Sequence, residues 1–186
     1  FLKQTRNSAA PGAISEKEAM EQPIVGYQLL EKMGSGGMAA VFKAKNIENG
    51  EIVAIKLLYP GHTQDEKILQ QFINEGMMLI KLDHKNILKG LDFGISKETF
   101  YFLSLEFIKG ESLLSFLEKG LKFTEEYTFD VILQISRALA YLEKRNIVHR
   151  DVKPANILLA DETVKLCDFA LALDMANPAH RKTQKS

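Results

Sequence analysis

Two short polar segments decide the fold that this sequence predicts: HRDVKPAN at residues 149–156 and CDFA at residues 167–170. The first segment places a carboxylate, a cation and an amide close together: Asp151, Lys153 and Asn156. The second adds the carboxylate of Asp168, twelve positions beyond that amide. Short apolar runs of strand-like composition border both segments, so we expect the first segment to be a loop between two strands.

These four side chains are of the kinds that phosphoryl transfer from ATP requires. Mg²⁺ prefers hard oxygen ligands, which Asn156 and Asp168 supply. The attacking hydroxyl needs an acceptor for its proton, and Asp151 supplies it. The charge on the migrating group needs a cation, which Lys153 supplies. The four groups in this order therefore predict a phosphotransfer site.

A glycine-rich segment, GSGGMAAV at residues 34–41, lies near the start of the chain. Glycines let backbone N–H groups approach phosphate oxygens, but a glycine-rich turn between strands is more often simply a turn. Dinucleotide-binding folds also use spaced glycines, and there the chain runs from a strand into a helix. Here a strand-like run follows at residues 40–45, and then the hairpin signal Asn49-Gly50. This context excludes the dinucleotide-binding interpretation.

A charge pair is predicted between Lys56 and Glu75. Lys56 ends a strand-like run at residues 52–56. A helix is expected at residues 64–82, and three apolar residues share one stripe with Glu75: Ile68, Phe72 and Leu79. A carboxylate on a buried stripe needs a cation, because an unpaired buried charge is costly. An exposed glutamate on the edge of the helix is the alternative.

The remaining elements are short strands and two helices. Beyond the runs at 40–45 and 52–56, strands are expected at residues 27–33, 87–93, 99–107, 147–148, 157–159 and 164–166. One helix is expected at 112–119, opened by Ser112 and ended by Gly120. The longest is expected at 124–145, with Thr124 as its cap and with acidic residues in its first turn, where the helix dipole favours negative charge. Its predicted apolar stripe consists of Ile132, Ile135, Leu139 and Leu142.

From about Tyr27 to Asp174 the chain resembles eukaryotic-type protein kinases of the serine/threonine subgroup, and its Gly-Gly-Met turn is similar to bacterial members. The subgroup is indicated by Lys153, two residues after Asp151. The resemblance implies an α+β, two-lobed, protein-kinase-like fold, with a β-rich N-lobe carrying one main helix and an incomplete helical C-lobe. By this resemblance, residues 1–26 would be a linker or disordered extension, and residues 27–108 the N-lobe with the hinge. Residues 109–174 would be the first part of the C-lobe with the catalytic loop, and residues 175–186 the start of an activation segment, which we expect to be disordered.

The resemblance also assigns roles to residues. It implies five catalytic residues: Asp151, Lys153, Asn156, Lys56 and Glu75. It implies Mg²⁺ at Asn156 and Asp168, and ATP at Met33, Gly34, Ser35, Gly36, Gly37, Met38, Ala39, Val41, Ala54, Lys56, Leu105, Glu106, Ile108 and Leu158. Among these, Leu105 would be the gatekeeper, and Glu106 and Ile108 would offer backbone groups to adenine. The ring would be sandwiched by Met33, Val41, Ala54 and Leu158. Core packing is the alternative interpretation for those apolar residues. The implied partner is a protein substrate with a serine or threonine hydroxyl.

The chain departs from the family pattern at two positions. Ala39 replaces the third loop glycine, and one methyl group there should still permit a phosphate lid. Ala170 replaces a glycine whose backbone angles can cost alanine about 1 kcal/mol. Our hypothesis is that Ala170 restricts flipping of residues 168–169. The two departures are the only support for a pseudokinase, a nucleotide-binding scaffold without phosphotransfer.

Two further features have a plain interpretation. Residues 92–94 spell Asp-Phe-Gly, the letters of the family's metal motif, but they precede the catalytic loop, and we interpret them as a strand end followed by a turn. Thr183 and Ser186 are candidate phosphorylation sites within the expected activation segment, although a disordered chain end is the simpler expectation.

The bulk composition excludes several classes of protein. With 24 basic and 24 acidic residues, nothing in the net charge indicates binding to nucleic acid or to a membrane surface. No apolar run approaches the ~20 residues that cross a bilayer, and no signal peptide is evident. The single cysteine, Cys167, fits a reducing compartment, so we expect a cytoplasmic protein. The chain begins with Phe1, and we expect it to be a fragment of a longer protein and to be inactive alone. A segment outside this chain could anchor the full-length protein to a membrane.

Overall fold

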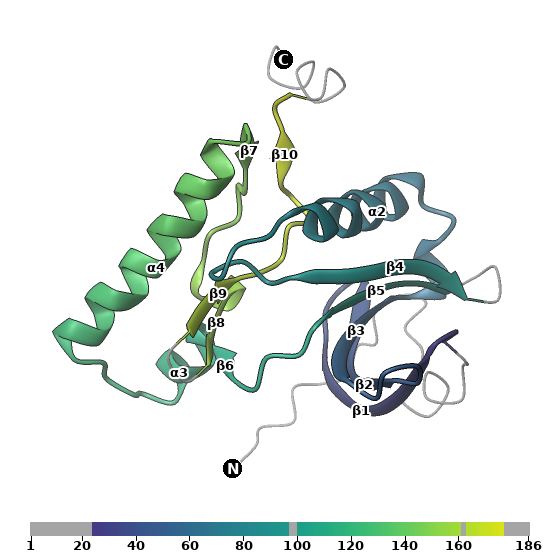
Figure 1. Ribbon diagram of the computed structural model, residues 1–186, viewed down its shortest axis with the longest axis horizontal. Helices are drawn as coiled ribbons and strands as arrows, with labels where there is room; N and C mark the ends of the chain where they lie inside the picture. The colour runs from purple at the N-terminus through teal and green to yellow at the C-terminus, as the bar shows by residue number, and fades with distance from the viewer. Residues whose placement is uncertain (1–23, 97–99, 161–162, 177–186) are drawn as a thin grey trace. The chain divides into compact units, whose positions relative to one another are not determined.

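The computed structural model describes residues 24–96, 100–160 and 163–176, which divide into two compact units (Figure 1). The first unit comprises the described residues up to Ile73 together with those of Leu91–Phe107. The second comprises those of Asn74–Gly90 and those from Ile108 onward. Helix α2 (Glu66–Lys81) contributes residues to both units. The predictions made for residues 1–23, 97–99, 161–162 and 177–186 lie outside the described residues. They include the candidate phosphorylation sites Thr183 and Ser186.

The first unit is built on a five-stranded sheet with the order β1-β2-β3-β5-β4. Its strands are β1 (Tyr27–Ser35), β2 (Ala39–Asn46), β3 (Ile52–Leu58), β4 (Gly90–Ser96) and β5 (Phe100–Glu106). The pairs β1–β2, β2–β3 and β3–β5 are antiparallel. A short 3₁₀ turn, η1 (Pro60–His62), follows β3. The predicted strands at 27–33, 40–45 and 52–56 are therefore confirmed.

The connection between β2 and β3 confirms the predicted hairpin and shows how the chain makes it. Glu51 accepts a hydrogen bond from the N–H of Asn46 at 2.8 Å, and Asn46 accepts one from the N–H of Gly50 at 2.9 Å. The side-chain oxygen of Asn46 also accepts from the N–H of Glu48 at 2.9 Å. Gly50 has a φ of 77°, which is favourable only for glycine. Four residues therefore lie between the hydrogen-bonded residues Asn46 and Glu51.

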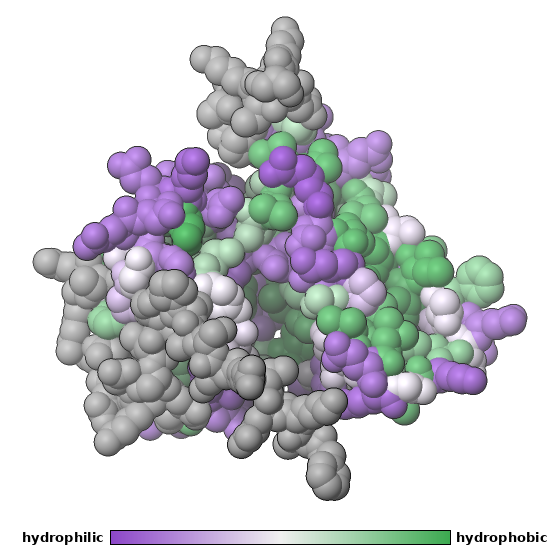
Figure 2. Space-filling model, turned by 180° about the vertical axis from the view of Figure 1, so that it is seen from behind, coloured by the Kyte–Doolittle hydropathy of each residue, from purple (hydrophilic) through white to green (hydrophobic). Residues whose placement is uncertain are grey.

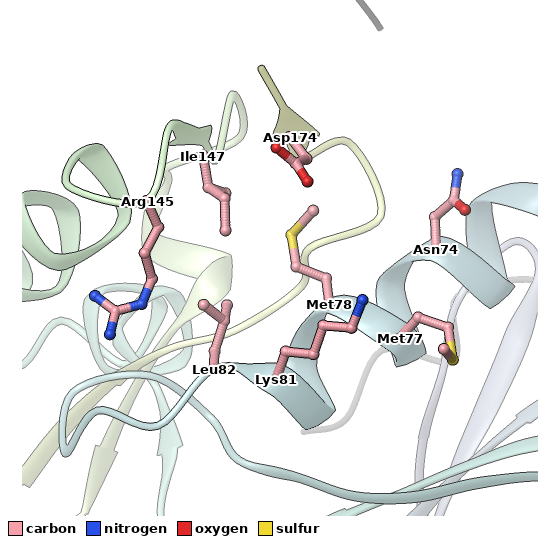
Figure 3. A pocket seen from close by; sticks show the side chains of 8 residues that line it. All are labelled: Asn74, Met77, Met78, Lys81, Leu82, Arg145, Ile147 and Asp174. Atoms are coloured by element: carbon pink, nitrogen blue, oxygen red, sulfur yellow. The ribbon is translucent and has the colours of Figure 1, made fainter. Parts of the chain in front are cut away.

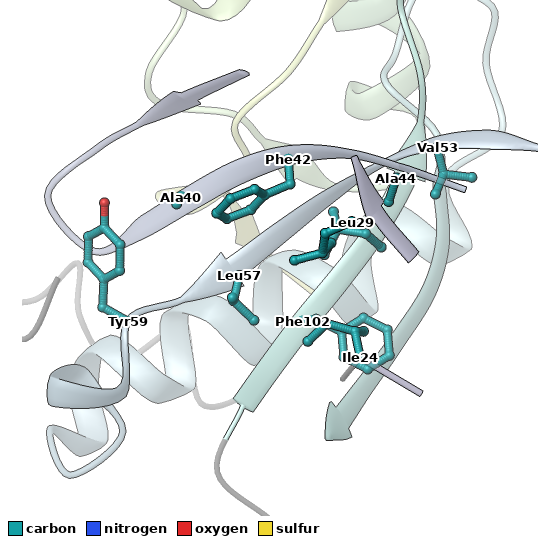
Figure 4. Close-up of a cluster of buried hydrophobic side chains, with 10 residues drawn as sticks. Ile24, Leu29, Ala40, Phe42, Ala44, Val53, Leu57, Tyr59 and Phe102 are labelled. Carbon is teal, nitrogen blue, oxygen red and sulfur yellow. The ribbon is translucent and has the colours of Figure 1, made fainter. Parts of the chain in front are cut away.

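The core of the first unit lies on one face of this sheet (Figure 4). It is made by alternating residues of the strands together with residues that flank them: Ile24, Leu29, Ala40, Phe42, Ala44, Val53, Ile55, Leu57, Tyr59 and Phe102. Ile24 lies in the segment that we assigned to the extension, yet its side chain is only 2% exposed. The packed part of the chain therefore begins before Tyr27.

Strand β4 begins three residues later than the sequence predicted. Ile87 forms a parallel bridge with Leu166, and the N–H of Leu88 donates to the carbonyl of Leu166 at 2.9 Å. Ile87 and Leu88 therefore pair with Leu166 of the second unit and do not belong to β4. The prediction of a strand end and a turn at residues 92–94 is wrong, because these residues lie inside β4. Glycine is needed at Gly94 because a Cβ there would lie 2.7 Å from the Phe102 ring.

The second unit combines helices with short strands. Its elements are β6 (Glu111–Ser112), α3 (Leu113–Glu118), α4 (Glu125–Glu143), β7 (Ile147–Val148), the 3₁₀ turn η2 (Pro154–Asn156), β8 (Ile157–Ala160), β9 (Thr163–Leu166) and β10 (Leu173–Asp174). They form one sheet of order β6-β8-β9 and a two-stranded sheet of β7 and β10. Both predicted caps are present: Ser112 accepts from the N–H of Ser115 and Thr124 from the N–H of Tyr127.

Helix α4 buries a face that overlaps only in part with the predicted stripe. Its buried residues are Val131, Gln134, Ile135, Ala138 and Leu142. The predicted stripe is correct for Ile135 and Leu142 but wrong for Ile132 and Leu139, which are 55% and 37% exposed. Apolar residues lie on more than one face of this helix, so periodicity alone could not select the buried one. Apolar residues gather on the side of the molecule where α4 lies (Figure 2).

A buried amide pair fixes the face that α4 presents. Asn86 is fully buried, and its side-chain nitrogen donates to the Gln134 side chain at 2.6 Å and to the Val164 carbonyl at 2.9 Å. The N–H of Val164 donates to the same Gln134 oxygen at 2.9 Å. A buried polar group needs such partners, so Gln134 must face inward.

Among the described residues, no helix has the combination of length and apolar character that crossing a bilayer requires.

Candidate active site

The loop at residues 149–156 starts with a buried histidine. His149 is 2% exposed, and its ring meets that of Phe169 edge-on with centroids 4.6 Å apart. Its Nε2–H donates to the carbonyl of Cys167 at 3.1 Å. Its Nδ1 accepts from the N–H of Asp151 at 3.2 Å. Because a carbonyl can only accept and an amide N–H can only donate, these two bonds specify one neutral tautomer.

The electrostatics agree with a neutral imidazole at this position. Burial lowers the pKa of His149, since water is excluded from the charged form. The hydrogen bond to the Cys167 carbonyl and the charges of Asp168 and Asp151 act in the opposite direction. Protonation of Nδ1 would also place two N–H groups against each other. His149 therefore serves as an uncharged support for the backbone of the loop.

Three of the predicted catalytic residues meet around one carboxylate. The Oδ2 atom of Asp151 accepts from Lys153 Nζ at 2.7 Å and from Asn156 Nδ2 at 2.9 Å. Asn156 Nδ2 also donates to the backbone carbonyl of Asp151 at 2.9 Å. Both side-chain bonds end on Oδ2, so Oδ1 accepts no hydrogen bond within the described part of the chain. The Asp151 side chain remains 23% exposed, so the carboxylate is partly open to solvent.

The charge state of this group follows from its partners. The hydrogen bond from Lys153, followed by that from Asn156, lowers the pKa of Asp151. The same contact with Asp151 raises the pKa of Lys153. Asp151 is therefore a carboxylate and Lys153 a cation at neutral pH. Together they place a carboxylate beside a positive charge, and their predicted catalytic roles stay predictions.

The β8–β9 hairpin positions the two predicted metal ligands. Ile157 pairs with Leu166, and the N–H of Cys167 donates to the carbonyl of Asn156 at 3.0 Å. Asn156 therefore lies opposite Cys167 at the open end of the hairpin, and Asp168 is the next residue. The Asn156 side-chain nitrogen is taken by Asp151, which leaves the oxygen as its free ligand atom.

The donor set fits a hard cation with few protein ligands. The described residues contain no group of three His, Cys, Asp or Glu side chains that could hold a metal by themselves. Mg²⁺ is usually bound through one or two carboxylates together with water and phosphate oxygens. One amide oxygen from Asn156 and one carboxylate from Asp168 match that pattern.

Within the segment of residues 167–170, Asp168 has a strained backbone conformation and Ala170 does not. Asp168 has a φ of 62°, in the left-handed region that costs energy for residues other than glycine. The N–H of Ala170 points to the Asp168 carboxylate, with a distance of 3.4 Å between nitrogen and Oδ1. Phe169 is 1% exposed, which holds the motif in place. Ala170 has no positive φ, so the alanine causes no strain in this conformation.

Arg150 ties the loop to the chain beyond Asp168, a contact that the sequence analysis did not predict. Its φ is 65°, and its Nε donates to the carbonyl of Leu171 at 2.6 Å. Strand β10 then pairs with β7 through Leu173 and Val148. The only sequence signal for this role was the position of Arg150 inside the quoted motif.

In the first unit, the glycine-rich segment links β1 to β2. The N–H of Gly36 donates to the carbonyl of Ala39 at 2.9 Å. A Cβ added at Gly34, Gly36 or Gly37 would meet no atom closer than 4.0 Å, and none of the three has a positive φ. The described chain therefore does not itself require glycine at these positions. An approaching ligand would, because a bare backbone lets phosphate oxygens reach the amides.

Four other predicted nucleotide-binding residues share one face of the sheet. The β2–β3 register pairs Val41 with Lys56, and the β3–β5 register pairs Ala54 with Leu105. Directly paired residues lie on the same face, and so do residues two apart on one strand. Val41, Ala54, Lys56 and Leu105 therefore project from the same face of the first unit.

The other predicted residues are divided between the units. Met33 lies on β1, Ala39 is the buried first residue of β2, and Glu106 ends β5. Ile108, Glu75 and Leu158 belong to the second unit. Glu75 is 2% exposed, as its predicted place on the buried stripe of α2 requires. Its pairing with Lys56 stays a prediction.

A separate cavity of about 280 Å³ lies in the second unit (Figure 3). It is lined by Asn74, Met77, Met78, Lys81, Leu82, Arg145, Ile147 and Asp174. None of these is a predicted site residue, and the guanidinium of Arg145 stacks on the Tyr141 ring at 3.6 Å. We therefore locate the candidate active site at the loop of residues 149–156 and not in this cavity.

Comparison with known proteins gives a consistent result. A family model described as a protein kinase domain matches residues 27–186. The chain is 33% identical to the serine/threonine-protein kinase PknA of Corynebacterium glutamicum, over 86% of this chain and 35% of that protein. It is 35% identical to the Aurora kinase of Schizosaccharomyces pombe, over 84% and 44% respectively. It is 32% identical to the serine/threonine-protein kinase PrkC of Bacillus subtilis, over 81% and 23%. The chain thus spans less than half the length of these relatives.

Proposed function

We propose, from the premise that this chain belongs to the protein kinase domain family, that the protein containing it transfers the γ-phosphoryl group of Mg-ATP to a serine or threonine hydroxyl of a protein substrate. The observation that carries the proposal is the environment of Asp151. One of its oxygens is held by Lys153 and Asn156, and the other accepts no hydrogen bond within the described part of the chain. Relatives named as serine/threonine-protein kinases support the same substrate class.

In this proposal Asp151 orients the substrate hydroxyl and accepts its proton. Because Oδ2 is fixed by two donors, Oδ1 is the atom that would receive the hydroxyl hydrogen bond. The lowered pKa keeps Asp151 ionised. In the ground state, Asp151 would therefore hold the hydroxyl in position through a hydrogen bond and would not yet remove its proton. Lys153 places a positive charge beside the acceptor, where negative charge on the migrating group would be stabilised.

The proposal assigns ATP to the glycine-rich segment and to the shared face of the sheet. The glycines would bring backbone N–H groups to the phosphates, and Lys56 would hold the α- and β-phosphates. Ala54, Val41 and Leu105 would contact the adenine. Asn156 and Asp168 would hold Mg²⁺, which supplies charge neutralisation on the phosphates when it is bound.

The alternative of a pseudokinase rests on Ala39 and Ala170. Ala39 is buried as the first residue of β2, so its methyl group serves the packing of the strand. Ala170 has an ordinary φ and leaves Asp168 in its motif. Neither alanine removes a charged group from the proposed mechanism.

The direct test is Asp151→Asn. The amide keeps the shape of the side chain but cannot accept the hydroxyl proton. Phosphotransfer should fall by at least about a hundredfold, while the Kd for Mg-ATP, measured by calorimetry, should change by less than about threefold because Asp151 is not assigned to the nucleotide. Equal losses of binding and of turnover would show that Asp151 has a different role.

A further inference from the structure

A short turn after β3 forms a rigid support beside the glycine-rich segment. It consists of Tyr59 and the 3₁₀ turn η1 (Pro60–His62). The N–H of His62 donates to the carbonyl of Tyr59 at 2.9 Å, and both the N–H and the Oγ1 of Thr63 donate to the carbonyl of Pro60, at 3.1 and 2.8 Å. Tyr59 is 2% exposed within the core cluster of Figure 4. The turn is therefore anchored in the core of the first unit.

This turn holds two successive carbonyl groups of the glycine-rich segment. The N–H of Tyr59 donates to the carbonyl of Met38 at 2.9 Å. The Nε2 of His62 lies 3.1 Å from the carbonyl of Gly37, and because a carbonyl only accepts, Nε2 carries the donated proton. The His62 ring also lies near the ring of Tyr59, with centroids 6.4 Å apart.

The two contacts fix the direction of the neighbouring amides. In a trans peptide the C=O and the following N–H point in opposite directions, and the described chain has no cis peptide bonds. With the carbonyls of Gly37 and Met38 turned to the support, the N–H groups of Met38 and Ala39 point away from it. The N–H groups of Gly37 and Met38 donate to no acceptor among the described residues, so they are available to an anion.

Glycine makes the opposite orientation easy to reach. A peptide unit that includes Gly37 can rotate at low steric cost, because Gly37 has open space around it and no Cβ. Rotation of the Gly37–Met38 unit would present a carbonyl oxygen where the amide now points. A carbonyl repels phosphate, so this rotation would convert an anion-binding segment into one that disfavours the anion.

We propose that His62 is a positioning residue that prevents this rotation. By holding the Gly37 carbonyl, it keeps the Met38 amide directed at the triphosphate of the nucleotide. The inference rests on the proposed function, since it concerns the same phosphate-binding segment. It adds a specific consequence: His62 contributes to the affinity for phosphates and not to the affinity for the nucleoside.

The experiment compares wild type, His62→Ala and His62→Gln in the full chain by titration calorimetry with Mg-ATP and, separately, with adenosine. Loss of one hydrogen bond in His62→Ala should raise the Kd for Mg-ATP about two- to tenfold. The Kd for adenosine should stay within about 1.5-fold, which also shows that the variant is folded. Glutamine can place an N–H near the position of Nε2, so His62→Gln should return the Kd for Mg-ATP to within about twofold of wild type.

Three results would overturn the inference while leaving the proposed function intact. These are an unchanged Kd for Mg-ATP in His62→Ala, an equal rise for ATP and adenosine, and a His62→Gln variant as weak as His62→Ala. Failure of the wild-type chain to bind either ligand would overturn the proposed function and the inference with it.

Discussion

The loop at residues 149–156 is held by a buried, neutral histidine. His149 connects the carbonyl of Cys167 to the backbone N–H of Asp151, so it links the two motifs through one neutral ring. Asp151 then receives Lys153 and Asn156 on a single oxygen. At the residue scale, the carboxylate that we propose as the proton acceptor is thus held from its backbone and from its side chain.

His149 should make the stability of the protein depend on pH. Burial lowers the pKa of His149 in the folded state below the ~6.5 of an unfolded chain. The unfolded state therefore binds a proton first, and the free energy of unfolding should fall as pH is lowered from about 7.5 to 5.5. Urea unfolding at several pH values measures this slope, which should be smaller in His149→Gln. His84, whose pKa burial also lowers, accounts for a remaining slope. An identical slope in both proteins would contradict the assignment.

Ala170→Gly tests the hypothesis that the alanine restricts flipping of residues 168–169. The observed conformation leaves Ala170 unstrained and puts the left-handed φ on Asp168. Glycine would open additional conformations at roughly 1 kcal/mol lower cost, so the observed one should be less populated. The Kd for Mg-ATP or the turnover number should then change by about two- to fivefold. The hypothesis is wrong if both quantities remain as in wild type.

At the scale of elements, the features that sequence predicts well are local. Caps at Ser112 and Thr124 and the hairpin at Gly50 depend on a few neighbouring residues, and all three are confirmed. The start of β4 was missed because Ile87 and Leu88 pair with a strand far along the chain. The buried face of α4 was predicted only in part because Asn86 selects it through Gln134.

The same division applies to the candidate site. The meeting of Asp151, Lys153 and Asn156 was predictable because all three lie in one short loop. The contact of His62 with Gly37 joins residues 25 positions apart, and no motif indicates it. A contact of that kind depends on where the turn after β3 places a side chain, which only the folded unit specifies.

The corrected face of α4 can be tested with a matched pair of substitutions. Leu142 is 1% exposed and Ile132 is 55% exposed, although the sequence placed both on the buried stripe. Leu142→Ala should lower the free energy of unfolding by about 2–5 kcal/mol, because it leaves a cavity. Ile132→Ala should change it by less than about 1 kcal/mol. Chemical denaturation measures both, and equal losses would favour the original stripe.

At the scale of the whole molecule, the chain consists of two units that differ in secondary structure. The first is mainly a five-stranded sheet, and the second combines α3 and α4 with short strands. The glycines and Lys56, which we propose as nucleotide-binding residues, belong to the first unit. Mg-ATP that binds only the folded state would stabilise the protein, by about 2.7 kcal/mol at a concentration of 100 times Kd. A thermal midpoint that rises with Mg-ATP concentration is therefore expected.

The central claim is phosphoryl transfer to a serine or threonine hydroxyl, and one measurement tests it most directly. The full-length protein that contains this chain is incubated with a mixture of protein substrates and with Mg-ATP labelled in the γ-phosphate. Acid hydrolysis of the labelled protein should then yield phosphoserine or phosphothreonine for wild type and almost none for Asp151→Asn. Binding of ATP by wild type without any transfer of label would contradict the claim and would leave a nucleotide-binding scaffold in its place.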